Sequence, residues 1–255
     1  MTMRIEKRRL ERYRETHTPK RIAERLDRGP APLYLKDFVY GAIDGGVTTF
    51  AVVAGVAGAG LSPIIVIILG CANLLADGFS MAVSNYLGSR AENQYRERMR
   101  RQEVHEVLTY PQGEEEEIRQ IFARKGFEGK LLDEVVETII SDTDRWVETM
   151  LQEEHGMSLE DHNAFKGALA TFTAFCLIGA IPLLPYLTNW LLTGTIAEPF
   201  LVSSLATGLA FFVVGAFKAR FVDRSWFRSG LETLAIGGAA ALLAYGVGRL
   251  LSGLV

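Results

Sequence analysis

The chain has 255 residues, of which 49% are hydrophobic and 22% are charged, and its formal net charge is −3 at pH 7. The charges are strongly segregated, because Asp44 and Asp77 are the only Asp, Glu, Lys, Arg or His residues between positions 38 and 88. A soluble domain spreads charge over every amphipathic element, so this segregation argues against a soluble protein and indicates a membrane protein.

The N-terminal segment, residues 1–36, is basic, and we expect it to be a cytoplasmic arm. Acidic residues are mixed into it and no small-residue cleavage pattern follows the first apolar run, so it is not predicted to be a secretory signal. Its basic residues are Arg4, Lys7, Arg8, Arg9, Arg12, Arg14, Lys20, Arg21, Arg25, Arg28 and Lys36.

Five apolar segments approach the length of about 20 residues that a membrane span needs. They cover residues 38–59, 63–87, 165–187, 200–217 and 231–251. Lys and Arg gather in the N-terminal arm and between the fourth and fifth segments, whereas the first connection and residues 185–199 contain neither. The positive-inside rule then predicts a cytoplasmic N-terminus, a cytoplasmic segment 90–164 and a C-terminus on the opposite side.

The segment between the second and third spans is rich in carboxylates, with 19 acidic and 10 basic residues between positions 90 and 161. Such an excess is usually a solvated face, but the spacing favours a metal site. Glu103 with Glu106, and Glu114 with Glu117, are i,i+3 pairs that each lie on one helix face. A break between the two helices lets the pairs converge, and four converging carboxylates would repel unless a cation joined them.

Met150 and Glu154, spaced i,i+4, could complete this ring of ligands. Carboxylate oxygens suit hard divalent cations, and a thioether biases the site toward softer transition metals. The histidines are weaker candidates. His105 lies off the face of the first carboxylate pair, and His155 and His162 have no His partner at i,i+3 or i,i+4.

The predicted fold class is an all-α membrane protein with five transmembrane helices. A cytoplasmic helical metal-binding domain is inserted between the second and third spans. No Pro lies between Ile64 and Tyr110, so the second span should continue as one helix out of the membrane. The predicted divisions are residues 1–36, 37–89, 90–164 and 165–255.

Polar side chains also lie inside the first two predicted spans, where ionisable groups are costly and commonly functional. Asp44 lies in the first span, and Asn73, Asp77 and Met81 recur at helical spacing in the second. A carboxylate from each helix of a hairpin, together with a thioether, indicates a metal passage. A hydrogen-bonded helix seam with protonated Asp side chains is the structural alternative.

Small residues crowd the first and fifth spans, and spacing such as that of Gly41 and Gly45 lets helix backbones approach closely in lipid. Both packing within one bundle and a subunit interface would use them. Five helices could line a pathway only narrowly, so a homodimer is a reasonable hypothesis.

Several motifs between residues 37 and 251 resemble those of the vacuolar iron transporter family, which is found in plants, fungi and apicomplexans and has many prokaryotic members. A glutamate-rich insertion accompanies them. The motifs are Gly41-Ala42-Ile43-Asp44-Gly45, Gly78-Phe79-Ser80-Met81-Ala82, Asn85-Tyr86-Leu87 and Leu183-Leu184-Pro185-Tyr186.

The resemblance implies a homodimer with the pathway at its subunit interface and export of Fe²⁺ from the cytosol by proton antiport. Mn²⁺, Co²⁺ and Zn²⁺ are the related substrates in that family. The membrane would be the plasma membrane in a prokaryote and the vacuolar membrane in a eukaryote. The chain would be a transporter rather than an enzyme, with no prosthetic group and no nucleic-acid partner.

Matched by motif, Asp44 and Met81 would be the metal residues inside the membrane. Asn73 departs from the family pattern, because the better-known eukaryotic members have a glutamate there, and an amide can bind metal but cannot carry a proton. Asp77, one helical turn further on, could take over that role. The resemblance implies that metal binds in the insertion through Glu103, Glu106, Glu114, Glu117, Met150 and Glu154.

Two other functions are alternatives to transport. A membrane-anchored metal buffer or sensor would bind metal without moving it, and would leave Asp44 and Asp77 without a role. An oxidase similar to the di-iron carboxylate bundles would need paired Glu-x-x-His ligands, and the insertion contains no such motif.

Overall fold

The computed structural model describes residues 10–11, 13–28, 34–159, 163–192, 194–221 and 224–254. His162 lies outside these residues, and so does part of the basic arm, namely Arg4, Lys7, Arg8, Arg9 and Arg12. The chain divides into a short unit, residues 1–33, and a large unit, residues 34–255. The short unit contains helix α2, Pro19–Arg28.

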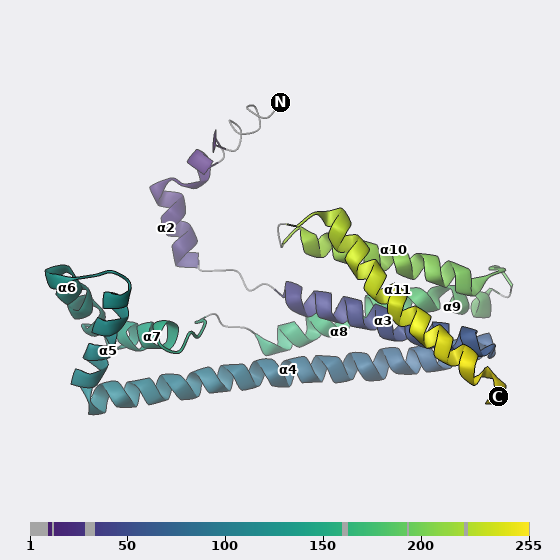
Figure 1. Cartoon of the computed structure of the whole chain (residues 1–255), viewed down its shortest axis with the longest axis horizontal. Helices are drawn as coiled ribbons and strands as arrows, with labels where there is room; N and C mark the ends of the chain where they lie inside the picture. The colour runs from purple at the N-terminus through teal and green to yellow at the C-terminus, as the bar shows by residue number, and fades with distance from the viewer. Residues whose placement is uncertain are drawn as a thin grey trace. The chain divides into compact units, whose positions relative to one another are not determined.

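The described part of the large unit is helical (Figure 1). Five of its helical segments are long and apolar enough to cross a membrane, as the sequence predicts. The elements in chain order are α3 (Leu35–Ala59), α4 (Pro63–Thr109), α5 (Pro111–Arg124), α6 (Gly129–Ile140), α7 (Thr143–Glu153), α8 (Ala164–Ala180), η1 (Ile181–Leu183), α9 (Leu184–Leu191), α10 (Pro199–Ala219), α11 (Trp226–Leu251) and η2 (Ser252–Leu254).

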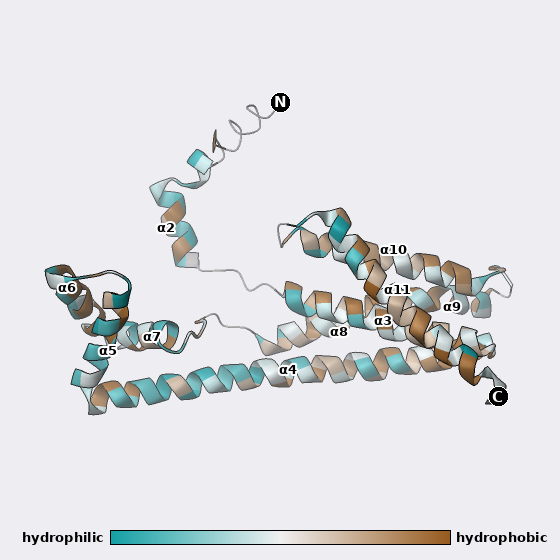
Figure 2. Ribbon diagram, viewed as in Figure 1, coloured by the Kyte–Doolittle hydropathy of each residue, from teal (hydrophilic) through white to brown (hydrophobic). Residues whose placement is uncertain are grey.

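Helix α4 is the longest element, with 47 residues and therefore a length of about 70 Å at 1.5 Å per residue. Pro63 lies in its first turn, where a missing N–H costs nothing. The helix changes from hydrophobic to hydrophilic along its length (Figure 2). Its apolar part suffices for one span, so the prediction of a single helix that continues beyond the span is confirmed.

The third span is interrupted where the sequence contains two prolines. Helix α8 is followed by the 3₁₀ turn η1, which contains Pro182, and then by α9, which has Pro185 in its first turn. Proline lacks the N–H that an α-helix needs and crowds the preceding turn, which explains the irregularity. The two prolines therefore account for the break between α8 and α9.

Helix α3 packs against α4, α8, α10 and α11 and lies at the centre of the membrane bundle. A Cβ atom at Gly41 would overlap the Thr171 carbonyl of α8, and one at Gly45 would overlap the Phe175 carbonyl. These two glycines therefore serve packing within one bundle, which is one of the two uses that the sequence left open.

We expect Gly45→Ala to destabilise the bundle by about 1–3 kcal/mol, because the added methyl group forces α3 and α8 apart. The thermal midpoint of the purified protein in detergent measures this loss. Gly238→Ala is the matched control, since a Cβ there meets no atom within 4 Å. An equal effect of the two substitutions would contradict the close packing of α3 on α8.

Helices α5, α6 and α7 pack on one another and on the polar end of α4. The predicted cluster of short helices is therefore present between the second and third spans. Eight buried side chains form its apolar core: Val107, Ile118, Val136, Ile139, Trp146, Val147, Met150 and Leu151.

Candidate metal site

Three glutamates converge where α4 ends and α5 begins. Glu103 and Glu106 come from α4 and Glu114 comes from α5, and a carboxylate oxygen of each lies within 4.8 Å of the other two. Tyr110, with φ of −140°, interrupts the helical path between α4 and α5 and allows them to face each other. The predicted convergence of the two carboxylate pairs is thus present for these three residues.

The end of α7 contributes to the same cluster. One ligand atom from each of Glu103, Glu154 and His155 lies within 4.8 Å of the other two. Glu117 is exposed, yet it lies close enough to Glu154, Glu103 and Glu106 for its carboxylate to be repelled by theirs. The sequence predicted Glu154 and gave His155 little weight, so the structure adds an imidazole to the predicted carboxylates.

Met150 lies one turn before Glu154, whose backbone N–H donates to the Met150 carbonyl at 3.0 Å. Its side chain is fully buried in the apolar core of α4–α7. Core packing accounts for this burial, so coordination by its sulfur remains a prediction.

The cluster has no basic counter-charge from Lys or Arg within the described chain. Several other carboxylates in the insertion are paired, such as Asp144 with Arg100 at 2.6 Å and Asp133 with Arg119 at 2.5 Å. Glu103, Glu106, Glu114, Glu117 and Glu154 have no such partner in the described ranges. This difference separates the cluster from a solvated acidic face, whose charges are screened or paired.

Two carboxylate oxygens of the cluster are buried without a hydrogen-bond partner among the described residues: Oε2 of Glu103 and Oε2 of Glu114. The exposed fraction is 1% for Glu103 and 7% for Glu114. A buried, unpaired carboxylate oxygen is costly. A divalent cation would neutralise these groups and use the free oxygens as ligands.

Burial, followed by repulsion from the neighbouring carboxylates of Glu117, Glu103, Glu106 and Glu154, raises the pKa of Glu114 to about 7. The pKa of Glu117 is also raised, first by partial loss of water around its otherwise exposed carboxylate and then by the charges of Glu154, Glu103 and Glu106. The pKa of His155 is raised chiefly by its hydrogen bond to Glu103. Protons and a metal ion would therefore compete for this cluster near neutral pH.

The polar residues in the membrane spans form a second group, on α3 and α4. Asn73 donates a hydrogen bond from Nδ2 to Oδ2 of Asp77, one turn away. Asp44 of α3 is half-buried and lies near enough to Asp77 for the two carboxylates to interact. Met81 is half-buried one turn beyond Asp77. The predicted pairing of carboxylates across the first hairpin is thus compatible with the geometry.

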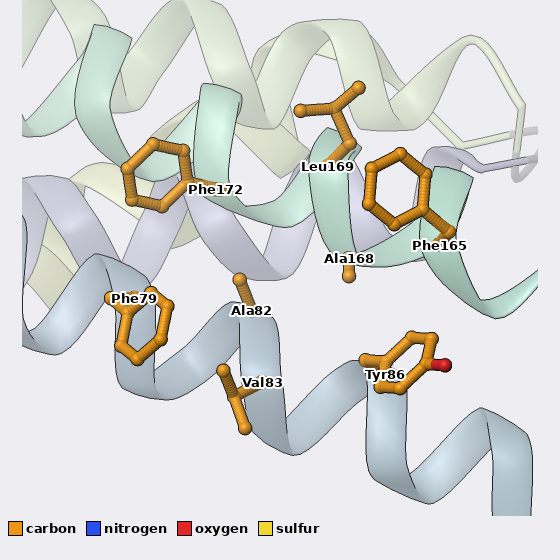
Figure 3. Close-up of a pocket in the computed structure, with 8 residues that line it drawn as sticks. All are labelled: Phe79, Ala82, Val83, Tyr86, Phe165, Ala168, Leu169 and Phe172. Carbon is orange, nitrogen blue, oxygen red and sulfur yellow. The ribbon is translucent and has the colours of Figure 1, made fainter.

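A groove between α4 and α8 is a contrasting, apolar feature of the spans (Figure 3). It contains no carboxylate, thiol or imidazole, so it offers no metal ligand. Its lining consists of Phe79, Ala82, Val83, Tyr86, Phe165, Ala168, Leu169 and Phe172.

Comparison with known proteins identifies the family. The sequence matches the VIT family over residues 35–249. A vacuolar iron transporter of Toxoplasma gondii is 35% identical over 225 residues, which cover 86% of this chain and 74% of that protein. The vacuolar iron transporter of Plasmodium berghei is 32% identical over 224 residues, with coverages of 86% and 82%. Vacuolar iron transporter 1 of Arabidopsis thaliana is 31% identical over 212 residues, with 83% of each chain covered. This chain is therefore a multi-pass membrane protein of the VIT family, a transporter and not an enzyme.

Proposed function

We propose that this protein exports Fe²⁺ from the cytosol in exchange for protons, with Mn²⁺, Co²⁺ and Zn²⁺ as further substrates. The observation that carries the proposal is the convergence of Glu103, Glu106 and Glu114 at one site. One carboxylate oxygen of Glu103 and one of Glu114 are buried there without a hydrogen-bond partner among the described residues. Relatives that cover most of the chain are named for iron transport.

Metal would be collected at the α4–α7 cluster and passed to the residues within the spans. In this scheme residues 90–164 are a cytoplasmic metal-binding domain, as the distribution of Lys and Arg supports. The cluster would use Glu103, Glu106, Glu114, Glu117, Met150 and Glu154. Asp44 and Met81, with Asn73 and Asp77 beside them, would then bind the ion during its passage through spans 37–89 and 165–255.

Proton exchange follows from the chemistry of the two carboxylates within the spans, Asp44 and Asp77. A deprotonated Asp44 or Asp77 binds a cation, and protonation from an acidic far side releases it. Because Asn73 cannot carry a proton, Asp77, to which it donates a hydrogen bond, would supply the second proton-accepting group.

A homodimer would cover the polar face of α4. Asp77, Ser80 and Ser84 lie on the span and are exposed in a single protomer. Contact of these groups with lipid would be costly, whereas the same face of a second copy would enclose them in a polar pathway. The host membrane would be the plasma membrane in a prokaryote and the vacuolar membrane in a eukaryote.

The direct test is Fe²⁺ uptake into proteoliposomes that contain a metal-sensitive fluorophore and an acidic lumen. We expect uptake, alkalinisation of the lumen during uptake, and competition by Mn²⁺, Co²⁺ and Zn²⁺. Uptake without alkalinisation would reject proton exchange and leave transport in place. Tight metal binding by the purified protein with no uptake would reject transport and favour a membrane-anchored buffer or sensor.

A further inference from the structure

His155 lies two residues beyond the end of α7 and points its imidazole into the carboxylate cluster. Its Nε2 atom is 2.7 Å from Oε1 of Glu103, although the two residues are 52 positions apart in the sequence. The backbone N–H of His155 donates to the Met150 carbonyl at 3.3 Å. The end of α7 therefore fixes the imidazole against the most buried carboxylate of the cluster.

The separation of these two atoms is close to that of two ligands of one ion. Metal–nitrogen and metal–oxygen bonds of about 2.0–2.2 Å place two neighbouring ligands roughly 3.0–3.4 Å apart, depending on the coordination angle. The His155–Glu103 pair would have to open by only a few tenths of an ångström to accept an ion. Oε2 of Glu154 lies 3.8 Å from Nε2 of His155, and one ligand atom of each of Glu103, Glu154 and His155 lies within 4.8 Å of the other two.

An independent observation points to a missing ligand at this place. Glu103 is 1% exposed, and its second carboxylate oxygen, Oε2, has no hydrogen-bond partner within the described chain. His155 satisfies only Oε1. The imidazole thus provides a hydrogen-bond partner for one of the two carboxylate oxygens, and the other oxygen is left to bind a cation.

We propose that Nε2 of His155 is a metal ligand, together with carboxylate oxygens of Glu103 and Glu154. This inference rests on the proposed function and specifies its substrate class. Imidazole nitrogen suits Fe²⁺, Co²⁺ and Zn²⁺, whereas Mn²⁺, Mg²⁺ and Ca²⁺ prefer oxygen ligands. His155 thus selects for the first group of ions at the loading site.

The alternative role for His155 is that of a hydrogen-bond partner that only orients Glu103. The two roles differ in metal selectivity. An orienting residue would support every divalent ion through the same carboxylate, so its loss would weaken Mn²⁺ and Co²⁺ binding alike. A ligand contributes nitrogen directly, so its loss would weaken Co²⁺ and Zn²⁺ binding and leave Mn²⁺ binding nearly unchanged.

The experiment compares Co²⁺, Zn²⁺ and Mn²⁺ titrations of the purified full-length protein with those of His155→Gln. His105→Gln is the matched control, because His105 is exposed on α4 and lies outside both three-residue groups of the cluster. We expect His155→Gln to weaken Co²⁺ and Zn²⁺ binding by about tenfold or more, the scale on which even second-sphere changes act. The visible ligand-field spectrum of bound Co²⁺ should also change in His155→Gln and stay unchanged in His105→Gln.

Each other outcome has a defined meaning. Equal loss of Mn²⁺ and Co²⁺ affinity in His155→Gln would overturn the inference in favour of an orienting role. Unchanged affinities and an unchanged Co²⁺ spectrum would overturn it as well. If the unmodified protein bound none of the three ions, the proposed function itself would fail. Circular dichroism on each variant would exclude misfolding as the cause of a lost affinity.

Discussion

Replacing Asp44 with Asn should lower Fe²⁺ flux by on the order of 100-fold while leaving Fe²⁺ binding at the glutamate cluster of the purified protein unchanged. Asn has nearly the same shape as Asp and keeps one side-chain oxygen, but it has no negative charge and cannot exchange a proton. Asp44 lies on α3, whereas the glutamate cluster is built by α4, α5 and α7. This variant should therefore lose Fe²⁺ flux and still bind Fe²⁺ at the glutamate cluster.

The measurements are proteoliposome uptake for flux and metal titration in detergent for binding. Glu232→Gln is the matched control, because Glu232 is an exposed carboxylate on α11 near the end of its span. We expect this control to keep normal flux. Unaltered flux in Asp44→Asn would remove Asp44 from the pathway, and loss of binding together with flux would show that the substitution disturbs the whole chain.

The membrane architecture could be predicted from the sequence because lipid imposes a simple rule on composition. A span must be apolar for about 20 residues, and all five segments that meet this rule lie in helices. The rule does not define helix ends, because a helix can continue after its apolar part. Helix α11 begins at Trp226, five residues before the predicted span, and its first turns carry polar side chains such as Arg228.

The site could be predicted where ligands lie on regular helices. The i,i+3 spacing on α4 and α5 was sufficient to pair Glu103 with Glu106 and to bring Glu114 toward them. The position of His155 beside Glu103 could not be predicted because α7 ends at Glu153, so helical periodicity no longer describes where the next side chains point. The signal that could have found it is its place directly after Glu154, a predicted ligand.

Replacing Glu114 with Gln should stabilise the metal-free protein and weaken its metal binding. The Glu114 side chain is 7% exposed, its Oε2 has no partner among the described residues, and four other carboxylates repel it. Gln keeps the size of the side chain and removes the charge, so desolvation and repulsion both decrease. A bound cation needs that charge, so we expect its affinity to fall by about 10- to 100-fold.

The gain in stability should depend on pH. Burial and, after it, repulsion by the neighbouring carboxylates raise the pKa of Glu114 from the ordinary 4.5 to about 7, so the folded state binds this proton more tightly than the unfolded state. The contribution of Glu114 to stability is therefore fully present below pH 4.5 and is lost as the pH rises through 7. Glu114→Gln lacks this loss, so its advantage in melting temperature should grow between pH 4.5 and 7. Metal affinity of the unmodified protein should rise over the same interval, because binding requires the deprotonated carboxylate.

Glu116→Gln provides the control on the same helix, because Glu116 is exposed and its carboxylate lies 4.0 Å from Arg119. Neither its stability nor its metal affinity should change appreciably. A decrease in metal-free stability in Glu114→Gln would show that hydrogen bonds, rather than repulsion, dominate at this position. A gain in stability without loss of affinity would place the metal elsewhere. Opposite signs for stability and affinity are expected only of a group whose charge is unfavourable until a cation joins it, and thermal unfolding with and without Co²⁺ measures both.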